Sequence, residues 1–173
     1  MIKVIGIDPG LSATGVGIAT GDGYKVDGFS FGSINTSKNM SVPGRLEKIF
    51  SDLIALLNDE KPDFMVIEDM FFTPKNPKAG VTLGKVSGVV LLAAYKAGVP
   101  VSEVPVREVK QVLTGNGSAG KRQLEESVRR RLNHQTPIKP YHASDALALA
   151  MIGLFRWDNE FSSIETPQPF LNR

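Results

Sequence analysis

The sequence predicts an α/β domain built on a mixed five-stranded sheet that is flanked by helices on both faces. Three β-like runs separated by short turns open the chain, and this pattern favours an antiparallel meander. Two shorter apolar strands then alternate with helical patterns, which is typical of parallel crossovers. With 173 residues, the chain is long enough for one domain with a sizeable core.

The individual elements follow from the apolar spacing and from the residues that interrupt it. We expect strands at residues 1–7, 14–19, 24–34, 63–68 and 101–104. We expect helices at residues 43–57, 81–97, 106–113, 121–132 and 141–157. A glycine-rich hairpin turn at 21–23 separates the second and third strands, and Ser41 stands where the first helix begins. Residues 71–79 contain two prolines and are expected to form a loop.

The helix expected at residues 81–97 is apolar on nearly all sides. Gly84 and Gly88 lie on one of its faces, which permits close approach of another helix. This face is either an interface between two copies of the chain or part of a helix that is fully buried within one subunit. The tail at 158–173 is polar, contains proline and is expected to be poorly ordered. The expected organisation is a single domain at residues 1–157 followed by this tail.

Composition excludes several classes of protein. The chain has no cysteine, which excludes disulfides and metal sites built on thiolates. No apolar run is long enough to span a membrane without interruption, and the N-terminal run lacks the apolar core and cleavage site of a signal peptide. We therefore expect a cytoplasmic protein with no membrane partner.

Charge is unevenly distributed along the chain. Residues 1–70 carry six Lys or Arg and ten Asp or Glu, residues 71–140 carry twelve and four, and residues 141–173 carry two and four. A basic middle segment attracts phosphates through Coulomb attraction and counterion release. Carboxylates outside it could hold a divalent cation. An ordinary solvated surface explains the charges about equally well.

Three carboxylates and one imidazole stand where a sheet fold brings side chains together. Asp8 ends the first strand, Glu68 ends the fourth, and Asp145 lies near the start of the last helix. His142 shares a helix face with Asp145 because the two are three residues apart. If the helix packs across the edge where the strands end, all four side chains meet. Taken singly, each has a plainer reading, such as a local turn at Asp8 or a helix-terminal hydrogen bond at His142.

Such a cluster would be repulsive without cations, and its donors suit a divalent metal. Mg²⁺ takes oxygen ligands and keeps several waters. Two such ions about 4 Å apart can activate water and stabilise the leaving oxygen of a phosphodiester. An imidazole among the ligands is compatible with Mg²⁺ and shifts the preference toward Mn²⁺.

Four motifs together resemble one known family. IKVIGIDPGLSATGVGIA, MVIEDMFF, VREVKQVLTGNGSAGKRQL and HASDALALAM are similar, in the same order, to the motifs of the RuvC family of Holliday junction resolvases. The resemblance spans residues 2 to about 157 and implies an RNase H-like fold. It implies that Asp8, Glu68, His142 and Asp145 are catalytic metal ligands for two Mg²⁺ ions, with Mn²⁺ also supporting activity. Many relatives carry Asp where this chain has His142.

The resemblance also implies how DNA is held. Lys110 and Lys121 would lie beside the catalytic centre and stabilise charge on a scissile phosphate. Phe71 would stack on an unpaired base at the branch point, while Phe72 would pack in the core. The basic run Arg129–Arg131 fits backbone contact and plain solubility equally. The expected DNA-binding set is Phe71, Lys75, Lys78, Lys85, Lys110, Asn116, Lys121 and Arg122.

The function that the resemblance implies is resolution of Holliday junctions during homologous recombination and DNA repair. A two-fold homodimer would match two equivalent phosphates of a four-way junction and nick two opposed strands. Relatives cooperate with the RuvAB branch-migration complex. Three alternatives remain: an actin-like ATP-binding fold, a related nuclease acting on RNA or RNA–DNA hybrids, and a junction-binding protein without catalysis.

Overall fold

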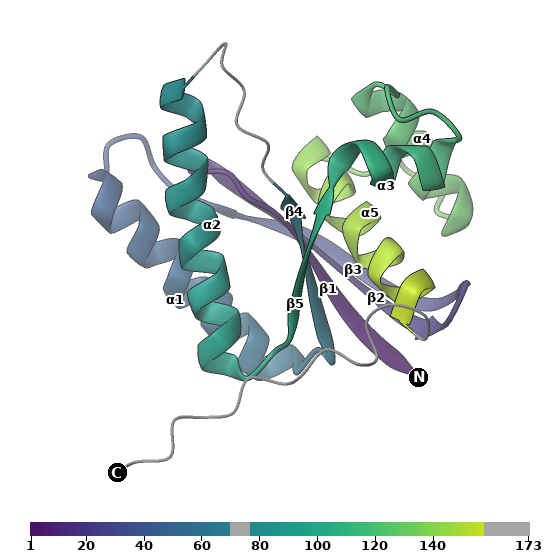
Figure 1. Cartoon of the computed structure of the whole chain (residues 1–173), viewed down its shortest axis with the longest axis horizontal. Coiled ribbons are helices and arrows are strands. Elements are labelled where there is room, and N and C mark those ends of the chain that lie inside the picture. Colours follow the sequence, from purple (N-terminus) through teal and green to yellow (C-terminus); the bar gives the residue numbers. More distant parts are fainter. Residues whose placement is uncertain (70–76, 158–173) are drawn as a thin grey trace.

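A five-stranded sheet forms the middle layer of the molecule, whose computed structural model describes residues 1–69 and 77–157. The strands are β1 (Ile2–Asp8), β2 (Ala13–Asp22), β3 (Lys25–Asn35), β4 (Phe64–Asp69) and β5 (Val101–Pro105). The helices of the described residues are α1 (Val42–Glu60), α2 (Pro77–Ala97), α3 (Val106–Thr114), α4 (Lys121–Arg131) and α5 (Tyr141–Arg156). Helices cover both faces of the sheet, which confirms the predicted architecture (Figure 1).

The strand order β3-β2-β1-β4-β5 brings the ends of β1 and β4 side by side. The β1–β2 and β2–β3 pairs are antiparallel, as predicted for a meander. The β1–β4 and β4–β5 pairs are parallel, as predicted for crossovers. Because Ile7 is paired with Ile67, the next residues, Asp8 and Glu68, lie side by side at the carboxyl ends of β1 and β4.

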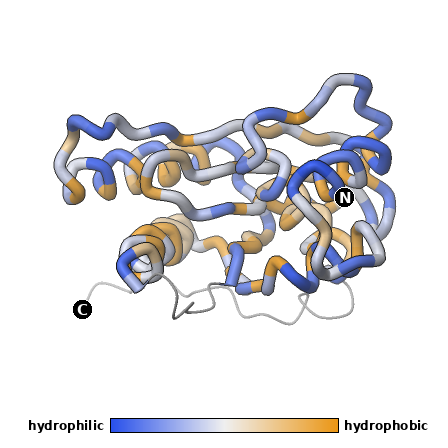
Figure 2. Tube along the Cα trace, turned by 90° about the horizontal axis from the view of Figure 1, so that it is seen from above, coloured by the Kyte–Doolittle hydropathy of each residue, from blue (hydrophilic) through white to orange (hydrophobic). Residues whose placement is uncertain are grey.

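Each face of the sheet has its own hydrophobic core, and hydrophobic residues concentrate between the layers (Figure 2). Ile49 of α1 and Val86 of α2 are fully buried against one face. Helix α5 is buried along most of its length against the other face, with α3 and α4 packed outside it. The catalytic candidates on α5, α3 and α4 are therefore carried by the layer opposite α1 and α2.

Glycines in β1 and β2 let the backbone of α5 lie directly on the sheet. A Cβ atom at Gly15 would lie 2.0 Å from the carbonyl oxygen of His142, and a Cβ at Gly6 would lie 2.0 Å from that of Ala146. Only hydrogen fits at these positions, because no larger atom can approach a backbone oxygen so closely. The glycines therefore fix the first turns of α5 against the strand that ends at Asp8.

Helix α2 differs from the prediction in two ways. It begins at Pro77, so the predicted loop at 71–79 is wrong for its last residues, because proline is favoured in the first turn of a helix. One side is buried through Val86 and Val90, whereas Val81 and Leu92 are 57% and 49% exposed. The alternative of a helix fully buried within one subunit is therefore wrong.

By length and composition alone, α2 is also the one helix of the described residues that could cross a membrane, with 22% of that stretch buried. A single such helix is weak evidence for a membrane span, since helices of soluble cores pass the same test.

Two smaller predictions concern the ends of elements. The hairpin turn lies at Gly23 and Tyr24 and not at 21–23, because β2 continues through Asp22 after a register shift at Thr20. Ser41 caps α1 as predicted, accepting a hydrogen bond from the Gly44 amide at 3.3 Å. The predicted tail at 158–173 lies outside the described residues.

Candidate active site

One cavity of about 330 Å³ at the carboxyl ends of β1 and β4 brings the predicted catalytic side chains together. Asp8 comes from β1, Glu68 from β4, and His142 and Asp145 from the first turns of α5. The remaining walls are formed by Pro9, Gly10, Leu83, Val106, Lys110 and Lys121. Residues that are far apart in the sequence thus share one site because β1 and β4 are neighbours and α5 crosses them.

Asp8 and His142 are in direct contact. The Nδ1 atom of His142 lies 2.7 Å from a carboxylate oxygen of Asp8. This bond orients the imidazole and leaves its second ring nitrogen for another partner. Burial raises the pKa of Asp8 to about 6, with a further contribution from the charge of Asp145, while a hydrogen bond from Glu68 and the charge of Lys121 oppose the rise.

Glu68 holds a proton more firmly than Asp8 does. Burial raises the pKa of Glu68 to about 7, and both the hydrogen bond with Asp8 and the charge of Asp8 add to the rise. The charges of Lys110 and Lys121 oppose it. Burial and the mutual repulsion of the two carboxyl groups therefore outweigh the nearby lysines and favour the protonated forms up to near neutral pH.

Asp145 supplies the clearest sign that the cavity suits a cation. Its Oδ1 atom is buried, with no hydrogen-bond partner among the described residues. Burial raises the pKa of Asp145, against the opposing charge of Lys121. A buried carboxylate oxygen without a donor is costly unless a cation or water meets it.

No three acidic or histidine side chains of residues 1–69 and 77–157 are grouped as ligands around one point. The donor set itself, three carboxylates and an imidazole, fits a hard divalent cation.

Lys110 and Lys121 reach the cavity from α3 and α4. The charge of Lys121 lowers the pKa of all three carboxyl groups, and that of Lys110 lowers the pKa of Glu68 and Asp145. These effects fall off with distance, so both ammonium groups lie within electrostatic reach of the carboxylates. The cavity therefore has an acidic floor and a basic wall.

The turn between the two lysines is held by side chains. Gln111 donates to the Gly115 carbonyl at 3.0 Å and accepts from the Gly117 amide at 3.0 Å. The predicted DNA contact Asn116 lies exposed on this turn, where its side chain accepts from the Ser118 amide at 2.9 Å. Gln111 could not be singled out from the sequence, because no local pattern marks a glutamine that bridges a turn.

The other predicted DNA contacts lie outside the cavity. Arg122 is exposed and pairs with Glu126 at 3.3 Å. Lys85 is exposed on α2, and Lys78 lines a separate shallow hollow at the start of that helix. The predicted contacts Phe71 and Lys75, and Phe72 with them, fall outside the described residues.

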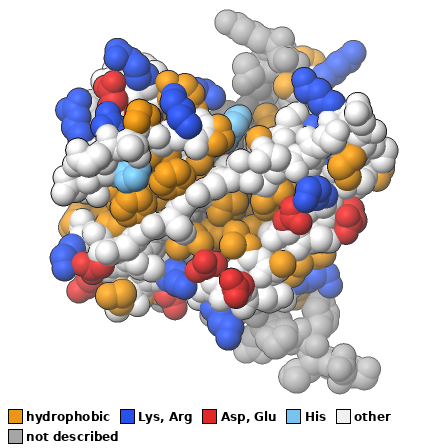
Figure 3. Space-filling view, turned by 180° about the vertical axis from the view of Figure 1, so that it is seen from behind, with side chains coloured by type: hydrophobic (Ala, Val, Ile, Leu, Met, Phe, Trp, Pro, Cys, Tyr) orange, Lys and Arg blue, Asp and Glu red, His pale blue; other side chains and the backbone are white. Residues whose placement is uncertain are grey.

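The arginines of the run Arg129–Arg131, predicted to serve either DNA backbone contact or solubility, differ in their surroundings. Arg129 pairs with the buried Glu125 at 3.2 Å, which favours a structural role for it. Arg130 is largely exposed and lies 4.0 Å from Glu126. Lys and Arg side chains gather around α4 on the face seen from behind (Figure 3). This corner of the molecule is thus positively charged beside the cavity wall formed by Lys121.

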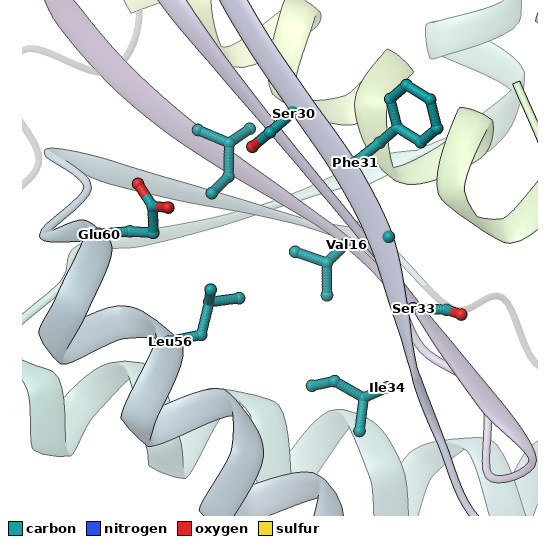
Figure 4. A pocket seen from close by; sticks show the side chains of 9 residues that line it. Val16, Ser30, Phe31, Ser33, Ile34, Leu56 and Glu60 are labelled. Carbon is teal, nitrogen blue, oxygen red and sulfur yellow. The ribbon is translucent and has the colours of Figure 1, made fainter.

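A second cavity, of about 250 Å³, lies between β3 and α1. Val16, Ile34 and Leu56 point into it (Figure 4). Glu60 is the ionisable residue of its lining, and its carboxylate pairs with Lys3 at 3.1 Å. This hollow is apolar and its one carboxylate is neutralised by Lys3, whereas the cavity at the ends of β1 and β4 gathers carboxylates, an imidazole and two lysines.

Comparisons of the sequence with known proteins agree on one family. Residues 4–153 match the family model described as crossover junction endodeoxyribonuclease RuvC. A RuvC of Brevibacillus brevis is 39% identical over 150 residues, which cover 87% of this chain and 90% of the relative. A RuvC of Thermotoga maritima is 36% identical over 149 residues, covering 86% and 88%.

Comparisons of the structure lead to the same family. A structure of Thermus thermophilus RuvC in complex with Holliday junction substrate aligns with a TM-score of 0.84 and 31% identity, over 93% of this chain and 98% of that one. The yeast mitochondrial Holliday junction resolvase aligns with a TM-score of 0.60 at 12% identity, which supports the fold alone. The chain therefore belongs to the RuvC family of crossover junction endodeoxyribonucleases.

Proposed function

We propose that this chain resolves four-way DNA junctions by hydrolysing one phosphodiester in each of two opposed strands, in homologous recombination and DNA repair. The observation that carries the proposal is the single cavity in which Asp8, Glu68, His142 and Asp145 face Lys110 and Lys121. Membership of the RuvC family and the likeness to a RuvC in complex with Holliday junction substrate support the choice of DNA.

Nucleases of this family are metal-dependent. For this chain we assign two Mg²⁺ ions, replaceable by Mn²⁺, to Asp8, Glu68, His142 and Asp145. The orphaned oxygen of Asp145 and the raised pKa values of Asp8 and Glu68 support this assignment. Bound cations would supply Lewis-acid stabilisation of the charge that builds up on the scissile phosphate.

The side chains of the protein itself orient the imidazole of His142 and neutralise charge on the phosphate. Asp8 holds the imidazole of His142 through Nδ1, so the ring presents its other nitrogen in a fixed direction. The ammonium groups of Lys110 and Lys121 stand opposite the carboxylates, where they stabilise negative charge on the phosphate in the transition state. The hydrogen bonds of Gln111 to Gly115 and Gly117 stabilise the turn that connects the helices carrying these two lysines.

DNA outside the cleavage point would be held by the basic surface around the cavity. We assign phosphate contacts to Asn116 and Arg122 near α4, to Lys78 and Lys85 on α2, and to Lys75. Phe71 is assigned to stacking on an unpaired base at the branch point, which is typically worth about 1–3 kcal/mol. The site of action is chromosomal DNA in the cytoplasm.

The exposed stripe of α2 supports a homodimer. Val81, Gly84, Gly88, Leu92 and Tyr95 form this stripe, and a Cβ atom at either glycine would meet nothing within 4 Å. Small residues flanked by apolar side chains allow two helices to approach closely, and a two-fold axis there would give two active sites for two strands. Cooperation with the RuvAB branch-migration complex is proposed from the family alone.

The test is incubation of the purified protein with an immobile four-way junction, a DNA duplex of the same sequence and an RNA–DNA hybrid, with Mg²⁺ or Mn²⁺. Paired nicks at symmetric positions in two opposed junction strands are expected, with none in the duplex. Preferential cleavage of the hybrid would instead identify an RNA-directed nuclease. Junction binding without nicking in either metal would identify a protein that only binds branched DNA.

A further inference from the structure

The guanidinium of Arg45 lies beside the turn that follows Asp8. Arg45 stands in the first turn of α1, and its side chain reaches back from the helix to the β1–β2 turn. Its Nη2 atom donates to the hydroxyl of Ser12 and its Nε atom donates to that of Thr36, each at 2.8 Å. These two bonds fix the guanidinium in place and use two of its five N–H groups.

Arg45 keeps its full positive charge unopposed. Both of its partners are neutral hydroxyls, and no carboxylate of residues 1–69 and 77–157 forms an ion pair with it. In contrast, Lys3, Lys25 and Lys48 of the same acidic half of the chain each pair with a carboxylate. An oriented arginine with spare N–H groups and no anion is suited to bind one.

The surroundings add to this preference for an anion. The first turn of α1 carries no acidic residue, so the positive end of the helix dipole is not neutralised there. Ser12 follows Pro9 and Gly10, which line the catalytic cavity together with Asp8. The guanidinium is thus attached to the rim of the site where a DNA strand must lie to be cut.

Arg45 and the two lysines approach this rim from opposite faces of the sheet. Helix α1 belongs to one layer, while α3 and α4, which carry Lys110 and Lys121, belong to the other (Figure 1). The two layers of the protein thus present cations toward this rim from different sides.

We propose that Arg45 is a DNA-binding residue that holds a backbone phosphate on the side of the cleavage site opposite Lys110 and Lys121. The proposal rests on the proposed function, since it needs a DNA strand in the cavity. Arg45 forms a charge-assisted pair with the phosphate through the N–H groups that Ser12 and Thr36 leave unused, and these hydroxyls keep the planar group facing the strand.

The test separates charge from the hydroxyl contacts by measuring junction affinity in metal-free buffer over a range of KCl concentrations. Each lost phosphate contact lowers the slope of log Kd against log salt by about 0.9. Arg45→Gln keeps a hydrogen-bond donor but removes the charge, so we expect this loss of slope and about tenfold weaker binding at low salt. Arg45→Lys keeps the charge and should retain the slope of the unmodified protein.

Two controls belong to the same experiment. Lys48→Met removes a cation about one turn further along α1, where Lys48 pairs with Asp52 at 2.6 Å, and should leave the slope unchanged. Ser12→Ala removes one of the two hydroxyl contacts without changing charge, and should also keep the slope. Thermal unfolding of every variant shows whether the fold is retained.

An unchanged slope for Arg45→Gln overturns the inference, whether its affinity stays the same or falls together with thermal stability. In the latter case Arg45 only fastens the turn to α1. If the unmodified protein does not prefer the junction to duplex DNA, the proposed function fails and the inference fails with it. If Lys121→Met lowers the slope and Arg45→Gln does not, only the inference fails.

Discussion

Burial couples the carboxyl groups of the site to the stability of the protein without metal. The pKa values of Asp8 and Glu68 are raised to about 6 and about 7, so the folded protein binds more protons than the unfolded chain. This contribution to stability is fully present below the unfolded pKa values, near 4, and is lost as pH rises through 7. At pH 8 the metal-free protein should therefore be less stable than it would be if Asp8 and Glu68 were protonated.

Glu68→Gln tests this coupling. At pH 8 in EDTA, we expect the variant to be roughly 1–2 kcal/mol more stable than the unmodified protein, allowing for solvent screening, because a buried charge is removed. At pH 4 the two should differ little. Denaturant unfolding at both pH values measures the difference, and a variant that is less stable at pH 8 would contradict the coupling.

Divalent cations should restore the stability that the charged carboxyl groups remove at pH 8. Adding Mn²⁺ at pH 8 should raise the Tm of the unmodified protein, since a ligand that binds only the folded state stabilises it. Glu68→Gln should respond much less, because one ligand is lost. An equal rise in Tm for both proteins would show that the ion binds elsewhere.

Lys121 should matter for the rate of cleavage more than for folding. Lys121→Met removes an ammonium group that acts on all three carboxyl groups, so we expect single-turnover nicking to slow by about 10- to 100-fold. The matched control is Lys25→Met, because Lys25 pairs with Asp27 at the far end of β3. Equal rates for the two variants would remove Lys121 from the site.

Single residues of the site could be predicted to different extents. Asp8 and Glu68 end apolar strands, and His142 and Asp145 are three residues apart on one helix, so pattern and resemblance both indicated them. The contacts of Arg45 with Ser12 and Thr36 could not be predicted, because they depend on which turns lie next to α1 in the fold. The contacts of Gln111 with Gly115 and Gly117 are local, but no sequence pattern marks a glutamine that bridges a turn.

At the scale of elements, the contact between α5 and the sheet positions half of the site. Gly15 is the most sensitive point, because a Cβ there would meet the His142 backbone at 2.0 Å. We expect Gly15→Ala to cost about 1–3 kcal/mol of unfolding free energy and to abolish nicking, since the first turn of α5 must move away from Asp8.

Gly32→Ala is the matched control, because a Cβ at Gly32 of β3 would meet nothing within 4 Å. It should leave both stability and nicking close to those of the unmodified protein. Urea unfolding and junction cleavage compare the two variants. Equal stability of Gly15→Ala and Gly32→Ala would mean that α5 does not need the close approach.

The sequence predicted the elements better than their ends. The order of strands followed from short turns and then crossovers, and Ser41 marked the start of α1. The start of α2 was placed too late, because prolines around residues 74–77 indicated a loop although proline also opens helices. Gly6, Gly15 and Gly17 were a signal of a helix lying on the strands, and only the three-dimensional contact with α5 made that meaning clear.

At the scale of the whole molecule, the fold accounts for the uneven charge along the chain and for the exposed stripe on α2. The acidic N-terminal part supplies Asp8 and Glu68, whereas the basic middle supplies Lys110, Lys121 and the arginines of α4. Folding turns this separation along the chain into a cavity with an acidic floor beside a basic surface. Charge alone could not predict that arrangement, since a solvated surface has the same composition.

Dimerisation through α2 gives a prediction for the assembled protein. Leu92→Glu places a charge in the exposed stripe, so we expect a monomer in sedimentation velocity and loss of paired nicking in the two strands. Tyr24→Glu places the same charge on a more exposed hydrophobic residue at the β2–β3 hairpin and should leave the assembly unchanged. A dimer that persists in Leu92→Glu would place the interface elsewhere.

The cleavage rate of Asp8→Asn on a pre-bound four-way junction tests the central claim most directly. The substitution keeps size and hydrogen bonding but removes the carboxylate that contacts His142 and lies beside Glu68. We predict that junction affinity stays within a few-fold of the unmodified protein while nicking with Mg²⁺ or Mn²⁺ falls to background. Nicking at the unmodified rate would show that these side chains do not form the catalytic cation site.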